Sequence, residues 1–298
     1  MTDQLLRLSI EDVWGAAEHV DTVALLIDEL VTGGMPTLPT GPAGEFTVVE
    51  DREAGMRSLL PVAALRAVRT AGLTAVAARR LLPAGAVTAA AVVARGPVAE
   101  LQVSALARDL PDLSHIAIAR PAPGDPLAPR LRRQLEGAGV GVFVTHVVAD
   151  AVQGANLVLV SHRDESEQPL SRSGLSPGTL VVCAQPGPPP LELVAGASEL
   201  YVDYLGLLRA AAPEYPLAPP GGGGGDTSMV GSRLSNSAPR RAVAADLVHV
   251  LTGTHPGRTN MDDVIMVVLL SAAGLSAELA RRLHRAARAH GLGLIQPE

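Results

Sequence analysis

The 298-residue chain contains no lysine: all 24 of its basic side chains are arginines, against 30 aspartates and glutamates. An enzyme that forms a Schiff base, including every pyridoxal-phosphate enzyme, needs a lysine amine as its nucleophile. A Walker-type NTPase or a protein kinase needs a lysine ammonium on the phosphates of its nucleotide. The lack of lysine therefore excludes all of these classes.

Cysteine and aromatic residues are also scarce. With Cys183 as its single cysteine, the chain can form neither an internal disulfide nor a zinc cage of cysteines. Aromatic residues make up 2% of the chain and the formal net charge is −6, so we expect no nucleic-acid partner. Apolar residues nevertheless reach 47%, which predicts a core of alanine, valine and leucine.

The sequence also lacks a segment directed to a membrane. Residues 1–12 are polar and acidic, without the apolar stretch of a signal peptide. The longest apolar run, residues 264–275, contains a serine and a glycine and is too short to span a bilayer. We therefore expect a soluble, cytoplasmic protein with no membrane partner.

The middle of the chain alternates short apolar runs with helical patterns. The runs predicted to be strands are residues 87–94, 115–119, 141–146, 157–160, 180–183 and 200–203. Turn signals and helical patterns separate them, which is typical of βαβ units, and their continuously apolar character indicates parallel strands covered on both faces. We predict an α/β fold with a Rossmann-like, doubly wound parallel sheet over residues 84–212.

The flanking segments predict a second, α+β domain formed by residues 1–83 and 240–298. On the N-terminal side Ser9 and Asp12 predict a capping box, and we expect helices over 20–31 and 62–82 and a strand over 45–50. On the C-terminal side we expect helices over 241–251, 261–270 and 276–290. Ser276 would cap the last helix and Gly291 would end it. The Pro/Gly-rich segment 213–239 is predicted to be a flexible loop.

A candidate nucleotide-binding turn follows the first of these predicted strands. Residues 94–99 read Ala-Arg-Gly-Pro-Val-Ala, where a Rossmann fold carries Gly-x-Gly-x-x-Gly/Ala and lets a pyrophosphate approach a helix N-terminus. The second glycine and the small third residue are kept, but an alanine replaces the first glycine. A plain βα turn explains the motif about as well, whereas the alternating strands favour nucleotide binding. The candidate cofactor contacts are Gly96, Pro97, Val98 and Ala99.

Four further positions are candidates for the same site. After the next strand an NAD enzyme carries an acid for the ribose, but here Arg120 is compatible with the 2′-phosphate of NADP. Arg69, followed by Thr70 on an alanine-rich helix, can fork onto a carboxylate or a phosphate. His162 lies in the loop after the strand 157–160, where it would be near the cofactor. The alternative is a surface role for Arg120 and a structural ion pair for Arg69. No spacing of residues is typical of a metal site.

Seven short motifs occur in order along nearly the whole chain. They are Leu-Ser-Ile-Glu-Asp-Val (8–13), Leu-Arg-Ala-Val-Arg-Thr-Ala (65–71), Val-Val-Ala-Arg-Gly-Pro-Val-Ala (92–99), Leu-Ser-Pro-Gly-Thr (175–179), Gly-Arg-Thr-Asn-Met-Asp-Asp (257–263), Ser-Ala-Ala-Gly (271–274) and Arg-Ala-His-Gly-Leu-Gly (288–293). Together they resemble the ornithine cyclodeaminase/mu-crystallin family. The resemblance implies a Rossmann domain, homodimers formed through a second domain, and hydride transfer from an α-amino acid to bound NAD(P). Cyclodeaminases then close a ring and release ammonia, whereas relatives are alanine dehydrogenases or imine reductases.

The resemblance also assigns roles to single residues. It implies that Arg69 contacts the substrate carboxylate and the cofactor phosphate, and that Ser271 lies near the cofactor. It further implies a general acid after the strand 180–183, but this position is Ala184 or Gln185, and neither can carry a proton at pH 7. The lysine of the family's Pro-Gly-Lys turn is Pro188, and the loop 34–44 is too short for the substrate-side arginine and lysine.

Two functions stay open on the sequence. The first is an NAD(P)-dependent oxidoreductase, cyclodeaminase or imine reductase that acts on a small amino or imino acid, with NADP more compatible than NAD. The alternative is a non-catalytic or accessory binding protein with a degenerate active site, in a bacterial biosynthetic pathway. The missing acid, the missing first glycine and the shortened substrate loop favour the second function. The order of the motifs and the presence of Arg69, Gly96 and Ala99 favour the first, which we rank ahead.

Overall fold

The computed structural model describes residues 4–33, 45–51, 56–83, 85–94, 96–119, 127–161, 170, 172–185, 187–210, 215–220 and 240–297. Its main feature is an eight-stranded sheet with the order β12-β9-β13-β8-β7-β4-β5-β6, in which every neighbouring pair is parallel. Its strands are β4 (Thr88–Val93), β5 (Leu113–Ala119), β6 (Gly141–Thr145), β7 (Leu157–Val160), β8 (Leu180–Cys183), β9 (Glu199–Val202), β12 (Ala245–Asp246) and β13 (Ile265–Val268). The predicted α/β fold with a Rossmann-like parallel sheet is confirmed.

The order of this sheet reverses beside β4. The chain passes from β4 through β5 to the edge strand β6, and then returns to β7 on the other side of β4. At such a switch point the connections on the two sides diverge and leave a crevice at the carboxyl ends of the strands, where ligands of open α/β sheets bind.

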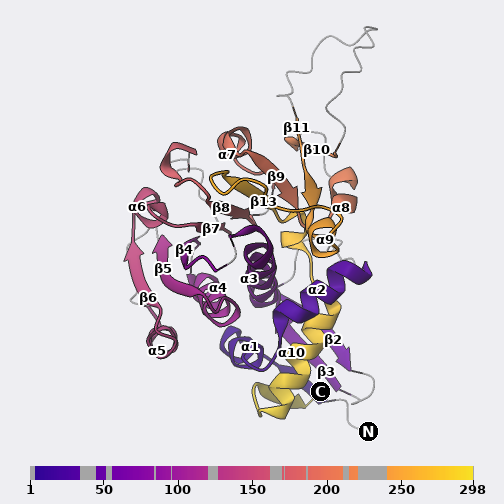
Figure 1. Cartoon of the computed structure of the whole chain (residues 1–298). Helices are drawn as coiled ribbons and strands as arrows, with labels where there is room; N and C mark the ends of the chain where they lie inside the picture. The colour runs from indigo at the N-terminus through magenta and orange to yellow at the C-terminus, as the bar shows by residue number, and fades with distance from the viewer. Residues whose placement is uncertain are drawn as a thin grey trace.

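Helices cover both faces of the large sheet (Figure 1). One face packs against α3 (Val62–Leu81), α4 (Gly96–Asp109) and α5 (Pro129–Gly137), and the other against α6 (Val148–Val152), α7 (Leu191–Gly196) and α8 (Leu205–Ala210). Along β7, Leu157 and Leu159 join the first core, whereas Val158 and Val160 join the second. Because successive side chains point to opposite faces, a strand covered on both sides is apolar throughout.

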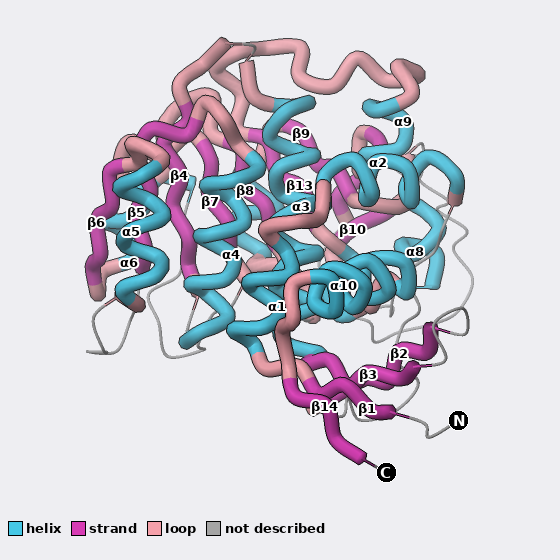
Figure 2. Tube along the Cα trace, turned by 90° about the horizontal axis from the view of Figure 1, so that it is seen from below, coloured by secondary structure: helices cyan, strands magenta, loops and turns pink. Residues whose placement is uncertain are grey.

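A smaller mixed sheet with the order β14-β1-β3-β2 is built from both ends of the chain. Its strands are β1 (Gln4–Arg7), β2 (Phe46–Asp51), β3 (Met56–Pro61) and β14 (Leu294–Pro297). Figure 2 shows α1 (Ile10–Ala17) and α10 (Ala277–Ala289) between this sheet and the rest of the molecule. A buried hydrogen bond of 2.5 Å between Ser58 Oγ and His284 Nδ1 joins β3 to α10. The two chain ends therefore meet in one unit, as predicted.

The remaining elements are α2 (Thr22–Thr32), α9 (Leu247–Leu251), the short pair β10 (Leu217–Ala218) and β11 (Arg241–Ala242), and the 3₁₀ turns η1 (Arg172–Gly174) and η2 (Leu270–Ala273). The predicted capping signals are confirmed. Ser9 and Asp12 form a reciprocal capping box, and the Ser276 hydroxyl accepts from the amide of Leu279 at 3.0 Å. Gly291, with φ +65°, follows His290, the C-cap of α10, and Gly33, with φ +76°, is the C-cap of α2.

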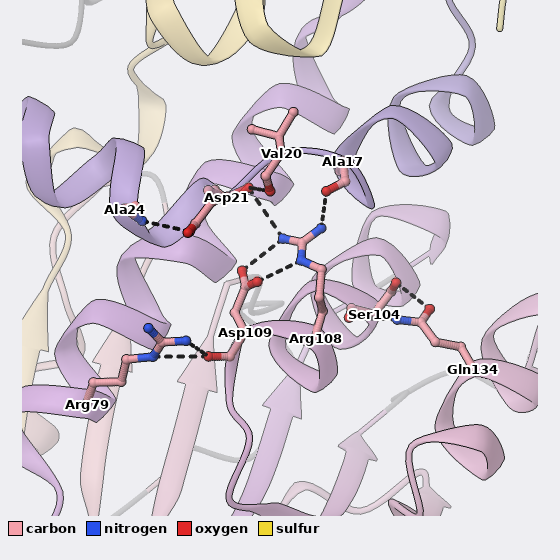
Figure 3. Close-up of polar contacts among 10 residues, drawn as sticks. Ala17, Val20, Asp21, Ala24, Arg79, Ser104, Arg108, Asp109 and Gln134 are labelled. Carbon is pink, nitrogen blue, oxygen red and sulfur yellow. Dashed lines mark hydrogen bonds and ion pairs between the residues drawn. The ribbon is translucent and has the colours of Figure 1, made fainter. Parts of the chain in front are cut away.

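A cluster of polar contacts at the end of α4 fastens the first two helices to the large unit (Figure 3). Arg108 pairs with Asp109 at 2.7 Å and donates to the Ala17 carbonyl at the end of α1. Arg79 of α3 donates to the Asp109 carbonyl at 2.5 Å. These contacts fix the corner between α1 and α2, and α2 therefore packs along α3.

Two of the expected C-terminal helices differ from the structure. The helix expected over 261–270 is wrong, because Ile265–Val268 is the buried strand β13 and η2 follows it. The helix expected over 241–251 is reduced to α9, since β11 and β12 precede it. A short apolar run does not distinguish a buried strand from a buried helix, and here pairing with β8 and β9 decides in favour of the strand.

The domain boundaries stay predictions, although β12 and β13 lie in the large sheet while falling in the segment 240–298. Of the predicted loop 213–239, only residues 215–220 are described, and they contain β10. No helix of the described residues is both long and apolar enough to cross a membrane.

Candidate functional site

Three polar side chains from distant parts of the sequence meet at the carboxyl edge of the large sheet. Asp203 follows β9, Ser271 lies in η2 just after β13, and Arg69 comes from α3. Their exposed fractions are only 1%, 1% and 3%. Burying polar and charged groups is costly unless they are paired, so this cluster requires partners for each member.

Hydrogen bonds connect the three residues in series. Arg69 Nη1 donates to the carbonyl of Ser271 at 3.0 Å and to its hydroxyl at 2.6 Å. The Ser271 hydroxyl in turn donates to Asp203 Oδ2. The carboxylate also accepts from the backbone amides of Ser271 and Leu270, at 3.0 and 2.9 Å. Asp203 therefore fixes η2, and η2 holds one end of the guanidinium.

Burial is the largest influence on both charges in this cluster. It raises the pKa of Asp203, and the bonds from Ser271 and the charge of Arg69 oppose that rise. Burial lowers the pKa of Arg69, and the charges of Asp203 and Glu29 oppose that fall. Neither Asp203 nor Glu29 was predicted as a site residue from the sequence. For Asp203 a signal existed, because an acid directly after an apolar strand lies at the ligand-binding edge of a parallel sheet.

Arg69 keeps part of its hydrogen-bonding capacity unused. Its Nε is buried, yet it has no hydrogen-bond partner among the described residues. A guanidinium has five N–H donors in a rigid fork, and those left without partners can receive a carboxylate or a phosphate. The neighbouring Thr70 is buried too, and its carbonyl accepts from the Thr74 hydroxyl at 2.7 Å within α3.

In the predicted nucleotide turn the second glycine position, Gly96, has the open backbone expected of such a turn, and the first position is Ala94. Gly96 opens α4 directly after β4 with φ +65°, and a Cβ placed there would meet nothing within 4 Å. Ala94, at the first glycine position, is buried, and so is Ala99, which packs under the start of the helix. Pro97 is exposed and Val98 half-buried. The open side of the turn fits the approach of a pyrophosphate to the N-terminus of α4.

The two residues that follow β8, Ala184 and Gln185, have no ionisable side chain. Ala184 is 5% exposed, and Gln185 Nε2 donates to the carbonyl of Pro188 at 3.2 Å. These are the two positions at which the resemblance implies a general acid. A carboxamide and a methyl group cannot exchange a proton at neutral pH.

Other predicted positions do not join this cluster. Arg120 and His162 lie outside the described residues. Arg258, from the motif 257–263, lies at the opposite edge of the sheet, where it donates to the carbonyls of Leu81 and Asp263, each at 2.6 Å, and of Gly178 at 2.9 Å. Its role is structural. No group of three histidine, cysteine or acidic side chains that could hold a metal ion occurs in the described part of the chain.

A known protein family resembles this chain in sequence, and solved structures resemble it in fold. The sequence model of the ornithine cyclodeaminase/mu-crystallin family matches residues 35–280. None of the curated protein sequences compared with the chain matches it. The solved structure of CmnK is 19% identical, with a TM-score of 0.64, and the match covers 99% of this chain and 98% of that one.

Two further solved structures each match this chain, and each match covers 99% of this chain and 99% of the other. They are the Δ1-pyrroline-2-carboxylate reductase of Thermococcus litoralis in complex with NADH and L-proline, and an archaeal alanine dehydrogenase dimer with bound NAD. Both are 14% identical to this chain, with TM-scores of 0.57 and 0.56. At these identities the likeness shows the shared fold.

Proposed function

Because the chain belongs to the ornithine cyclodeaminase/mu-crystallin family, we propose that it is an NAD(P)-dependent oxidoreductase acting on a small amino or imino acid. The observation that carries the proposal is the buried series Arg69–Ser271–Asp203 at the edge of the sheet where α/β folds bind ligands. The reductase and the dehydrogenase that share this fold hold NADH with L-proline and NAD, respectively.

The turn after β4 would hold the dinucleotide. The positive φ of Gly96 and the open space above it leave room for the pyrophosphate, with Pro97 and Val98 beside it. Buried Ala99 allows α4 to pack closely on the sheet, which is the role of the third small residue in such turns. When bound, the dinucleotide supplies or accepts the hydride.

Arg69 would bind the substrate carboxylate. Its Nη1 is held by Ser271, so the plane of the guanidinium is set before a ligand arrives, and Nε is available for an anion. A hydrogen bond to a charged group contributes about 1.5–3 kcal/mol, roughly a 10- to 100-fold change in affinity. Asp203 and Ser271 act as positioning residues, because each reaches the ligand only through Arg69.

The end of β8 favours imine reduction over ornithine cyclisation. Cyclodeamination needs several proton transfers at nitrogen, and Ala184 and Gln185 provide no acid for them. Reduction of an iminium ion that already carries its proton needs only the hydride. The proposed substrate is therefore a small imino acid, bound by its carboxylate at Arg69.

Two further proposals concern the cofactor phosphate and the assembly. The position after β5, where an NAD enzyme has an acid for the ribose, is Arg120. A positive side chain there suits the 2′-phosphate of NADP. The outer face of the small sheet carries Val48 and Leu294, exposed by 55% and 70%, and suits a homodimer, the state of the archaeal alanine dehydrogenase.

Titration with NADH and with NADPH, followed by nucleotide fluorescence and thermal shift, tests the proposal. We expect at least one to bind, and Arg120→Ala should weaken NADPH more than NADH. Turnover is then measured with cyclic imino acids by the loss of nicotinamide absorbance. If neither nucleotide binds at millimolar concentration, the oxidoreductase proposal is rejected. Binding without turnover of any amino or imino acid would favour the alternative, an accessory protein with a degenerate site.

Arg69→Met is the matching test of the substrate contact. Methionine keeps much of the buried volume and removes the charge, so the KM for the imino acid should rise about 10- to 100-fold. The control is Arg80→Met, an exposed position on the same helix, which should leave KM unchanged. An unaltered KM in Arg69→Met would place the carboxylate elsewhere.

A further inference from the structure

Helix α2 brings a second carboxylate to Arg69. The two helices pack closely at Gly72, where a Cβ would lie 2.6 Å from Leu26 Cδ1 and 2.7 Å from Thr22 Cγ2. One turn beyond Leu26, α2 carries Glu29, and one turn before Gly72, α3 carries Arg69. Residues three or four apart lie on one helix face, and the two side chains are close enough to attract each other.

Both side chains keep a buried atom without a partner. Neither Glu29 Oε2 nor Arg69 Nε has a hydrogen-bond partner among the described residues. The nearby hydroxyl of Ser276, the N-cap of α10, favours the ionised form of Glu29 and so lowers its pKa, but less than the charge of Arg69 does. Each charge is thus compensated by attraction over a distance rather than by a closed ion pair, and an incoming ligand can change that balance.

Glu29 differs from the other charged groups of the site in its access to solvent. It lines a groove of about 850 Å³ between α2 and α10, whereas Asp203 and Arg69 are 1% and 3% exposed. A proton can therefore reach Glu29 from the groove without passing through the packed core.

We propose that Glu29 is a second counter-ion of Arg69, beside Asp203, when no anion is bound, and that it takes up one proton when an anion binds to Arg69. This inference rests on the proposed function, because it takes Arg69 as the ligand-binding group. Glu29 is thus a positioning residue that couples ligand binding to pH. It acts on the ligand through Arg69 and not by direct contact.

Charge balance explains why Glu29 and not Asp203 would take the proton. An anion on Arg69 places three negative groups around one positive group in a region of low dielectric. Asp203 is 1% exposed, and three backbone amides, those of Tyr204, Leu270 and Ser271, donate to its carboxylate together with the Ser271 hydroxyl, so its oxygens are already occupied. Glu29 lines the groove, and the attraction of Arg69 is the largest influence opposing the rise that burial causes in its pKa. The anion cancels this attraction, so the pKa of Glu29 rises further.

The direction of the pH dependence follows from linkage. A group whose pKa is higher in the complex takes up a proton on binding, so affinity is greatest at low pH. Affinity falls as pH rises from the pKa of Glu29 in the free protein to its pKa in the complex. Both lie above the ordinary value of 4.5. Within that window a one-proton linkage weakens binding by up to about tenfold per pH unit.

Other charged groups around Glu29 set the controls. Glu278 of α10 repels it, and this residue is itself paired with Arg281 and Arg282 at 3.4 and 2.9 Å. Further groups line the same groove or lie on α9, which also packs on α2: Asp21, Asp28, Arg285, the stacked rings of His19 and His290, and His249, which is paired with Asp246.

Calorimetry on the full chain tests the inference. The probe is pyrrole-2-carboxylate, a planar analogue of a cyclic imino acid whose ring nitrogen does not titrate near neutral pH, added to protein saturated with NADH or NADPH. Heats are measured between about pH 5 and about pH 8 in two buffers of different ionisation enthalpy, which together give the proton uptake. We expect an uptake approaching one proton inside the window.

The isosteric variant Glu29→Gln should abolish this uptake, flatten the pH profile and bind the probe more tightly than the wild type near pH 8. Asp28→Asn, an exposed neighbour that lines the same groove, should keep the wild-type slope. If Glu29→Gln does not fold, the uptake measured on the wild type decides. Binding without proton uptake overturns this inference and leaves the proposed function intact. Failure of both nucleotides and the probe to bind overturns both.

Discussion

The carboxyl ends of β13 and β8 are neighbours in one sheet, yet they are built differently. After β13, Ser271 joins Arg69 to Asp203 in a buried, hydrogen-bonded series. After β8, Ala184 and Gln185 provide no charge and no titratable proton. One strand end holds the charges that we propose bind an anion, whereas the other lacks the acid that the family resemblance implies.

The contribution of each strand end to folding stability explains why the residues after β13 and those after β8 can differ from the family pattern independently. Removing one member of a buried charge pair leaves the other uncompensated and is strongly destabilising. The series at β13 therefore contributes to folding as well as to the proposed ligand binding. Ala184 and Gln185 after β8 belong to no such charge pair, so the lack of an acid there bears on the proposed reaction.

The largest expected effect is on stability. Asp203→Ala leaves Arg69 buried without its main counter-ion and leaves the amides of Ser271 and Leu270 without an acceptor. We expect the free energy of unfolding in urea to fall by about 3–5 kcal/mol. The control is Asp246→Ala, another buried acid at a strand end, which caps α9 without an arginine and should cost about 0.5–2 kcal/mol.

The double variant Asp203→Ala/Arg69→Met sharpens this test. It removes both charges together, so it should be more stable than Asp203→Ala alone. If the free energies of unfolding lost in Asp203→Ala and in Arg69→Met simply added up in the double variant, the coupling between Arg69 and Asp203 would be disproved. The cluster would then have to be explained by packing.

The second effect concerns the end of β8. If the missing acid limits oxidation of α-amino acids, Gln185→Asp should raise that turnover by about a hundredfold, the lower end of what a positioned acid or base contributes. The rate should rise with pH as the carboxylate ionises. Gln185→Asn is the matched control without a proton, and Ala184→Asp tests the other candidate position. No gain in either aspartate variant would show that β8 is not where the reaction is limited.

Much of the large sheet follows from the sequence because its strands are short, apolar and separated by clear turns. Strands β7 and β8 were predicted at their observed bounds. The strand β13 was missed because Ile265–Val268 fits a buried helix as well as a buried strand, and only pairing with β8 and β9 decides. The strands β1 and β14 pair with each other across the whole length of the chain, and periodicity within a short window carries no information on such pairing.

The site was predicted less completely than the fold. Arg69 was selected from its place on an alanine-rich helix and Ser271 through the family resemblance, and the structure brings them together at 2.6 Å. Asp203 was missed although it directly follows an apolar strand, a signal in the local sequence. Glu29 was missed because its importance comes from the packing of α2 against α3 beside Arg69, which local sequence does not show. Arg120 and His162 stay predictions.

The smallest expected effect is at Gly96. It tests whether the turn after β4 binds the nucleotide, as the cluster after β13 is proposed to bind the substrate. A Cβ at Gly96 meets nothing, so Gly96→Ala costs only the left-handed backbone, about 1–2 kcal/mol. If the turn holds a pyrophosphate, nucleotide affinity should also fall several-fold, because the helix start shifts and a methyl group occupies the approach. Gly137→Ala, at the end of α5 with open space around it and no positive φ, should leave both stability and affinity nearly unchanged. A loss of stability in Gly96→Ala with unaltered affinity for NADH and NADPH would make this an ordinary βα turn.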